Sequence, residues 1–100
     1  MGKYRILYLP IAERDLIEIL EYVKQDKPKA AIALLDEIDR VILNLEDFPE
    51  SCRLSNDLRL NRLGYRILVV GNYLVFYVIK GKVVEIRRIL HGHRRYDFLL

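Results

Sequence analysis

Three segments in the second half of the chain have the residue pattern of β-strands. They are Tyr65–Val70, Tyr73–Ile79 and Val83–Leu90, each rich in β-branched and aromatic residues. Gly71-Asn72 separates the first two, and Lys80-Gly81-Lys82 separates the second two. Because spacers this short join neighbouring strands, the sequence predicts a meander of two tight antiparallel hairpins.

The middle segment, Tyr73–Ile79, carries apolar residues at both odd and even positions, so both of its faces are expected to leave water. The rest of the chain supplies two helices, and these normally pack together on a single face of a small sheet. The opposite face is therefore expected to be a docking surface for a partner chain.

The first half of the chain changes from a strand pattern to helical spacing. Tyr4–Leu9 are expected to form a strand that Pro10 closes, and the helix that follows is expected to end near Asp26. Pro28 suits the first turn of a second helix, which Phe48-Pro49 ends. Since the link is short, the two helices are expected to form an antiparallel hairpin. Their apolar stripes are Ala12, Leu16, Ile19, Leu20 and Val23, and then Ala31, Leu34, Leu35, Ile38, Ile42 and Leu45.

The first strand is expected to pair with an edge of the meander. The prediction is an α+β fold in a single domain, residues 1–100: an N-terminal strand, an antiparallel helical hairpin, then a three-stranded antiparallel meander, forming a small twisted four-stranded sheet. The stretch from Phe48 to Leu63 shows no periodicity and is expected to be irregular. Its apolar residues, expected to hold it in place, are Phe48, Leu54, Leu58, Leu60 and Leu63.

Several classes of protein are excluded by what the chain lacks. Cys52 is the only cysteine, which excludes an internal disulfide and, with no signal peptide in view, favours a cytoplasmic protein. No apolar run approaches the roughly 20 residues that a membrane span needs. His91 and His93 have no further ligand at metal-binding spacing, and no glycine-rich loop suits a phosphate. We therefore expect no metal, no cofactor and no membrane association.

The formal net charge is only +3, but the charges are unevenly distributed. From Glu13 to Glu50 there are eleven acidic and five basic residues, a balance of −6. From Ser51 to Leu100 ten Lys or Arg oppose three acidic residues, a balance of +7. The sheet half is therefore expected to be basic and to favour a nucleic acid or an acidic protein segment as partner, unless these charges only solvate the surface.

A basic cluster at the end of the last strand holds the candidate chemistry. Metal-free RNA cleavage needs a base for the 2′-hydroxyl, cations for the phosphorane and an acid for the leaving oxygen, and His with Arg supply all three. The same side chains bind phosphate or carboxylate without any chemistry, so a nuclease and a binding site both stay open. Arg66 on a neighbouring strand approaches the cluster if the strands pair in sequence order. The cluster consists of Arg88, His91, His93, Arg94, Arg95 and Tyr96.

These candidates also have structural interpretations. Arg88 falls in phase with Ile86 and Leu90, which suits an ion-pair partner across the sheet. Packing or backbone hydrogen bonding accounts equally well for Tyr73, Tyr77 and His91.

Several short phrases of the chain occur in the order and spacing of a known superfamily. They are Ala12–Tyr22, Pro28 and Ala30-Ala31, then Leu45, Phe48-Pro49 and Arg53, and finally Gly64–Val70, Asn72–Tyr77 and Ile89–Arg95. On these phrases the chain resembles, nearly end to end, the RelE/ParE superfamily of type II toxin–antitoxin toxins.

The resemblance implies a growth-inhibiting toxin, of the kind linked to plasmid stabilization, that a small antitoxin encoded beside it holds inactive. In this superfamily the C-terminal segment of the antitoxin wraps the toxin. The implied fold is a helical hairpin packed on a twisted antiparallel sheet, and a higher-order toxin–antitoxin hetero-oligomer is expected through the resemblance.

The superfamily divides between ribosome-dependent mRNA cleavage and poisoning of DNA gyrase. The RelE-like ribonuclease branch carries cationic residues on the strand Tyr65–Val70 and at the start of the next strand. Only Arg66 and Arg94 match such positions here, because Leu68 stands where that branch has a lysine and Tyr73 where it has an arginine. These replacements remove much of the charge stabilisation that a metal-free ribonuclease needs.

Asn72–Tyr77 and Leu90–Arg95 resemble the ParE branch, so we expect a ParE-like toxin that binds gyrase and performs no covalent chemistry. The residues expected to bind the target or the antitoxin are Tyr73, Tyr77, His93, Arg95 and Tyr96. The alternative is a RelE-like mRNA endoribonuclease that acts on the ribosome, an mRNA interferase, whose catalytic residues would be Arg66, Arg88, His91 and Arg94.

Overall fold

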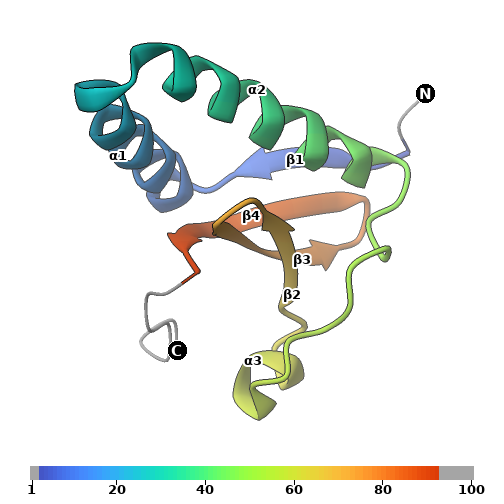
Figure 1. The fold of residues 1–100 in the computed structure, drawn as a ribbon. Coiled ribbons are helices and arrows are strands. Elements are labelled where there is room, and N and C mark those ends of the chain that lie inside the picture. Colours follow the sequence, from blue (N-terminus) through green and yellow to red (C-terminus); the bar gives the residue numbers. More distant parts are fainter. Residues whose placement is uncertain (1–2, 93–100) are drawn as a thin grey trace.

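Two long helices lie over a four-stranded sheet in this computed structural model, which describes residues 3–92 (Figure 1). In chain order the elements are β1 (Arg5–Tyr8), α1 (Pro10–Asp26), α2 (Pro28–Leu43), the 3₁₀ helix η1 (Asn44–Glu46), α3 (Leu58–Arg62), β2 (Arg66–Val70), β3 (Tyr73–Lys80) and β4 (Val83–His91). The predicted order of a strand, a helical hairpin and a three-stranded meander is confirmed.

The sheet has the strand order β1-β4-β3-β2. The meander is antiparallel, and β1 pairs with one of its edges as expected. That edge is β4, and the β1–β4 pairing is parallel, from Arg5 opposite Val83 to Tyr8 opposite Ile86. The sheet is therefore mixed, not antiparallel throughout. The helical hairpin is the cause, because it returns the chain to the end where β1 began: the Glu46 carbonyl accepts the N–H of Tyr4 at 3.1 Å. A long connection of this kind is the crossover that parallel strands need. β2 then runs in the same direction as β1, and two antiparallel steps through β3 give β4 that direction as well.

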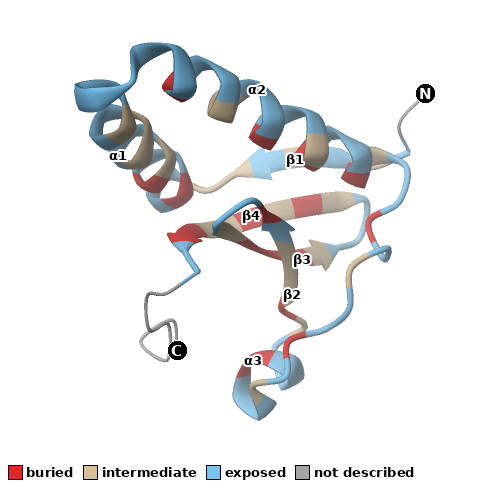
Figure 2. Ribbon diagram, viewed as in Figure 1, coloured by how far each residue is buried: buried red, intermediate tan, exposed pale blue. Residues whose placement is uncertain are grey.

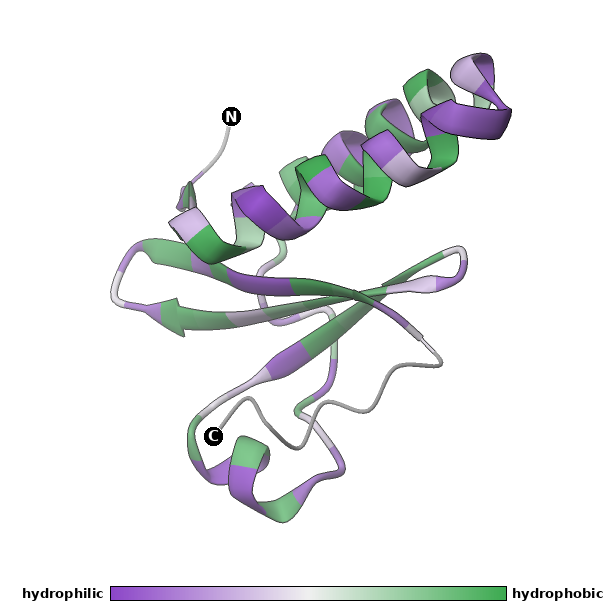
Figure 3. Ribbon diagram, turned by 90° about the vertical axis from the view of Figure 1, so that its left-hand side faces the viewer, coloured by the Kyte–Doolittle hydropathy of each residue, from purple (hydrophilic) through white to green (hydrophobic). Residues whose placement is uncertain are grey.

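α1 and α2 form the predicted antiparallel hairpin and cover one face of the sheet (Figures 1 and 3). Pro10 and Pro28 each stand in the first turn, where a missing N–H costs no intrahelical bond. The buried stripes face the sheet, as the red bands of α2 in Figure 2 show. The helix-side cluster comprises Ala12, Ile38, Ile42, Leu45, Val70, Val75, Tyr77, Val84, Ile86 and Ile89.

The opposite face of the sheet is partly covered, contrary to the expectation that it is all free for a partner. The short helix α3 lies below it in Figure 3, although this stretch was expected to be irregular. Asp57 is the N-cap: its Oδ1 accepts the N–H of Arg59 at 2.9 Å and that of Leu60 at 3.2 Å. Leu60 then packs in a second buried cluster, the far-face cluster, with Tyr65, Phe76, Val78 and Leu90.

Few apolar side chains of the stretch from Phe48 to Leu63 point inward, because its only α-helix, α3, has a single turn. Of the five apolar residues expected to hold the stretch in place, only Leu60 is buried. The expectation is wrong for the other four, which are exposed to solvent: Phe48, Leu54, Leu58 and Leu63. The far face therefore keeps apolar side chains in contact with water.

A β-bulge in β4 reverses the alternation of its side chains. Tyr77 pairs with Ile86 and Phe76 with Arg88, which leaves Arg87 as the extra residue. Ile86 and Ile89 consequently both join the helix-side cluster, while Leu90 joins the far-face cluster. The prediction that Arg88 is in phase with Ile86 is wrong, because the bulge lies between them, whereas Arg88 and Leu90 stand opposite Phe76 and Leu74 and remain in phase.

Candidate functional site

Arg88 is held by a carboxylate from α1. Its Nε donates to Asp15 Oδ2 at 2.7 Å and its Nη2 donates to Asp15 Oδ1 at 3.0 Å, so the pair is bidentate. Asp15 Oδ2 also accepts the Ile89 N–H at 3.0 Å. The hydrogen bond that Arg88 donates to Asp15 is the main cause of its raised pKa, against the opposing effect of burial. The ion-pair interpretation of Arg88 is confirmed, with its partner on a helix.

Arg66 binds the chain that approaches β2. Its Nη1 donates to the Cys52 carbonyl at 2.6 Å, and Leu54 forms an isolated β-bridge with Arg66 itself. The guanidinium is thereby used to fasten the irregular stretch to the sheet. A side chain in this position stabilises the loop and is not directed toward the end of β4.

Tyr77 is a core residue. It is 0% exposed, and its hydroxyl donates to the Pro49 carbonyl at 2.7 Å. Burial is the main cause of the raised pKa of Tyr77. The packing interpretation of this tyrosine is therefore confirmed, and its buried ring offers no surface to a target or an antitoxin.

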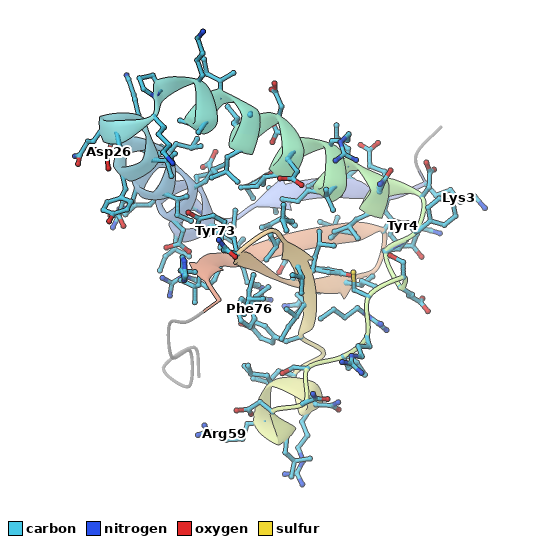
Figure 4. All side chains as sticks on the ribbon, viewed as in Figure 1. Lys3, Tyr4, Asp26, Arg59, Tyr73 and Phe76 are labelled. Carbon is cyan, nitrogen blue, oxygen red and sulfur yellow. The ribbon has the colours of Figure 1, made fainter. Side chains whose placement is uncertain are left out.

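Tyr73 and His91 face each other at the ends of β3 and β4. They are register partners, with ring centroids 5.4 Å apart at an interplanar angle of 81°. Just beyond them the Gly92 N–H donates to the Asn72 carbonyl at 2.7 Å. His91 is exposed, Tyr73 is half-buried, and Figure 4 shows Tyr73 at the end of the sheet near the helices.

A cleft of about 340 Å³ opens between α1 and these two rings. Its helix side contains Glu18 and Tyr22, and Asp15 stands in its wall already paired with Arg88. The complete lining is Asp15, Glu18, Ile19, Tyr22, Tyr73, Ile89, Leu90 and His91. The cleft therefore offers an imidazole, two phenols and a carboxylate.

The structure separates the candidate catalytic residues. Arg66 pairs with Tyr77, whereas Val70, the register partner of Tyr73, lies four residues further along β2. At about 3.4 Å per residue, Arg66 is roughly 14 Å along the sheet from the row that contains His91. The strands pair in sequence order, yet Arg66 is at the far end. His93, Arg94, Arg95 and Tyr96 lie outside the described residues.

The sequence interpretation missed Asp15, although a signal for it exists. Asp15 lies on the apolar stripe of α1, three residues after Ala12 and four before Ile19. Acidic residues are almost never buried unless they are paired, so a carboxylate at this position indicates a cationic partner inside the fold. The arginine that pairs with Asp15 is identified only by the tertiary structure.

Metal and membrane roles gain no support from residues 3–92. This range contains no group of three or more His, Cys, Asp or Glu side chains placed to hold a metal ion. None of its helices is long and apolar enough to cross a membrane.

Comparisons with known proteins agree with this architecture. The family model for the ParE toxin of type II toxin–antitoxin system, parDE, matches residues 6–96. Among solved structures, a chain from the chromosomal ParDE TA system from P. aeruginosa is similar, with a TM-score of 0.75 and 18% sequence identity over 89% of this chain and 96% of that chain. A comparison with curated proteins gives no match.

The fold defines a small α+β domain of the RelE/ParE type, in which a helical hairpin covers one face of a mixed four-stranded sheet. Since the family model spans most of the sequence, the chain belongs to the ParE toxin family of type II toxin–antitoxin systems. It is a type II toxin by family, and a cognate antitoxin is its partner.

Proposed function

We propose that this chain inhibits growth by binding DNA gyrase, and that it performs no covalent chemistry of its own. The main support is that two of the candidate catalytic arginines already bind groups of the protein. Arg88 donates hydrogen bonds to the Asp15 carboxylate, and Arg66 donates one to the Cys52 carbonyl. Metal-free cleavage of RNA needs cations convergent on one phosphate. Arginines bound to the protein itself and separated along the sheet do not supply that arrangement.

The surface that we assign to the target or the antitoxin is the end of the sheet beyond β3 and β4. Within the described residues it presents the Tyr73 ring, edge to face with the exposed His91. His93, Arg95 and Tyr96 follow directly in the sequence and are proposed to extend the same surface. Tyr77 is not included because it is buried.

The second candidate function is ribosome-dependent mRNA cleavage by Arg66, Arg88, His91 and Arg94. One observation favours it: the imidazole of His91 is exposed at the mouth of a cleft of about 340 Å³, where a general acid or base is accessible to a nucleotide. A base alone is insufficient, because the phosphorane also needs cations.

An induction experiment separates the two functions. The chain is expressed from a tightly controlled promoter, and within minutes the ends of cellular mRNA, the DNA damage response and plasmid supercoiling are followed together. We expect intact mRNA and gyrase-dependent DNA breaks. Codon-positioned mRNA ends without DNA damage would overturn the gyrase proposal and return His91 to a catalytic role.

The same experiment in vitro uses purified components. Gyrase, relaxed plasmid and ATP are incubated with the chain, and trapped cleavage complexes are resolved on gels. The chain premixed with its cognate antitoxin is the control, and we expect it to abolish the trapped complexes.

We further propose that the two proteins act in the cytoplasm as a higher-order hetero-oligomer, which light scattering of the purified complex measures.

A further inference from the structure

The cleft between α1 and the ends of β3 and β4 presents two tyrosine rings and a carboxylate. Glu18 and Tyr22 are four positions apart on α1, so they stand on the same face of the helix, one turn apart. Tyr73, labelled in Figure 4, lines the sheet side at the start of β3. Tyr22 is 76% exposed, and Glu18 is exposed as well. These groups are therefore accessible to a ligand from solvent.

The size of the cleft suits a single side chain or a small molecule. Its volume of about 340 Å³ is near the lower end of the roughly 300–1,000 Å³ that is typical of ligand sites. Apolar side chains, Ile19 from the helix and Ile89 and Leu90 from the sheet, complete the lining. A ligand with a flat polar end and an apolar stem fits this combination.

The carboxylate of Glu18 is the unbalanced charge of the cleft. Asp15, in the cleft wall, already forms a bidentate pair with Arg88, so these two charges offset each other. In the part of the chain that the structure describes, Glu18 forms no salt bridge. A cation from outside the fold is therefore the natural partner of this carboxylate.

The charge of α1 as a whole also favours a cation. Between Pro10 and Asp26 the sequence has five acidic and two basic residues. The faces of tyrosine rings attract cations too, because the π-electrons give them negative potential. Arginine suits such a site better than lysine, since its planar guanidinium both stacks on aromatic rings and pairs with carboxylates.

We propose that this cleft binds an arginine side chain of the target protein, with the guanidinium paired to Glu18 and held against the rings of Tyr22 and Tyr73. This deepens the proposed function and rests on it for the identity of the target, gyrase. The cleft shares Tyr73 and His91 with the end of the sheet that we assign to the target. The antitoxin is the less suitable source, because the basic half of the chain favours an acidic segment and the cleft favours the opposite charge.

A small probe tests the cleft of the full chain without any partner protein. The probe is N-acetyl-argininamide, and its control is N-acetyl-citrullinamide, which has nearly the same shape but no charge. NMR follows the signals of Glu18, Tyr22 and Tyr73 during each titration. We expect the arginine derivative to bind about fivefold or more tightly than the citrulline derivative, and this preference to disappear in Glu18→Gln. Equal binding of the two probes, or shifts confined to residues outside the cleft, would show that the site does not exist.

Matched variants of α1 test the same contact with gyrase. Glu18→Gln removes the charge and Tyr22→Ala removes a ring, whereas Tyr22→Phe keeps the ring. Glu21→Gln is the control, because Glu21 is exposed on the same helix but does not line the cleft. We expect Glu18→Gln and Tyr22→Ala each to need about tenfold more protein to trap the same amount of gyrase cleavage complex, where tenfold is about 1.4 kcal/mol. Tyr22→Phe and Glu21→Gln should stay within about twofold. Circular dichroism and thermal unfolding confirm that each variant is folded.

The failure of this inference is distinguishable from the failure of the proposed function. If the unmodified chain traps no cleavage complexes, gyrase is not the target, and the source of the arginine is wrong along with it. If the unmodified chain traps them and Glu18→Gln does so at the same concentration, the proposed function stands and the arginine contact is wrong. Normal trapping by Glu18→Gln together with about tenfold weaker antitoxin binding would assign the arginine to the antitoxin and contradict the choice of the target.

Discussion

Asp15 on α1 and Arg88 on β4, 73 positions apart in sequence, form a bidentate ion pair with contacts of 2.7 and 3.0 Å. The same carboxylate accepts the Ile89 N–H beside the bulge. One aspartate thus satisfies a guanidinium and the N–H of a residue that lies beyond Val83–Ile86, the part of β4 that β1 pairs with. The pair fastens the helical hairpin to the strand that carries the candidate site.

Asp15→Asn should destabilise the fold by about 3–5 kcal/mol, because removing one partner of a buried pair leaves the other charge uncompensated. The side chains are 8% and 14% exposed, so solvent screens the pair little. Unfolding in urea measures the loss. Asp36→Asn, at an exposed site on α2, is the control and should change stability by less than about 0.5 kcal/mol. Equal midpoints for Asp15→Asn and the unmodified chain would contradict the role given to the pair.

Tyr77→Phe should cost about 1–3 kcal/mol, since the change removes one hydroxyl and leaves the Pro49 carbonyl without its donor. Ring packing is retained, so the far larger loss expected for a cavity is avoided. Chemical denaturation gives the total effect, and hydrogen exchange locates it in the stretch after Pro49. Tyr22→Phe removes a hydroxyl from an exposed tyrosine and is expected to be neutral. A neutral Tyr77→Phe would refute the anchoring role of the hydroxyl.

Stability should fall as pH rises from about 10 to about 12. Burial, and then the charge and hydrogen bond of Asp39, raise the pKa of Tyr8 from 10.0 to about 12. The folded state therefore retains the phenolic proton where the unfolded state loses it, so this stabilisation is complete below pH 10 and disappears as pH passes the folded pKa. Lysines titrate in the same range. The measured quantity is accordingly the difference between the chain and Tyr8→Phe, whose urea midpoint should decline less over this interval, with Tyr22→Phe as the unaffected control.

Much of the fold follows from short-range patterns. Helical spacing and the two prolines locate α1 and α2 closely, and the glycine-containing spacers locate the turns of the meander: Gly71 and Gly81 adopt φ of 57° and 60°, which side chains rarely do. The pairing of β1 with an edge of the meander also follows from the order of elements, but the choice of the β4 edge does not. The parallel direction of β1 does not, because it depends on where the hairpin ends in space.

The candidate site was less predictable because long-range contacts build it. A bulge adds one residue before Arg88 without a sequence marker, so the phase of the residues that follow it does not show in their spacing. The contact of Arg88 with Asp15 joins positions 73 apart in the sequence. The burial of Asp15 was readable as a carboxylate on an apolar stripe, but its partner was not. The sequence carries one signal of α3, the polar N-cap Asp57 ahead of apolar residues. A helix of a single turn has too little hydrophobic periodicity to be recognised from sequence.

His91→Gln should leave growth inhibition and the trapping of gyrase cleavage complexes unchanged within about twofold. Glutamine keeps a polar side chain of similar length beside Tyr73 but cannot transfer a proton near neutral pH, so the change removes acid–base chemistry together with the ring contact to Tyr73. In the ribonuclease alternative the same variant loses about 10²–10⁴-fold in rate, the usual contribution of a general acid or base. Tyr73→Ala is the informative companion, because it deletes one ring of the proposed contact surface and should weaken gyrase binding while the half-buried position leaves the chain folded. Loss of toxicity in His91→Gln with normal gyrase binding would show that this histidine does chemistry, and the gyrase proposal would then be wrong.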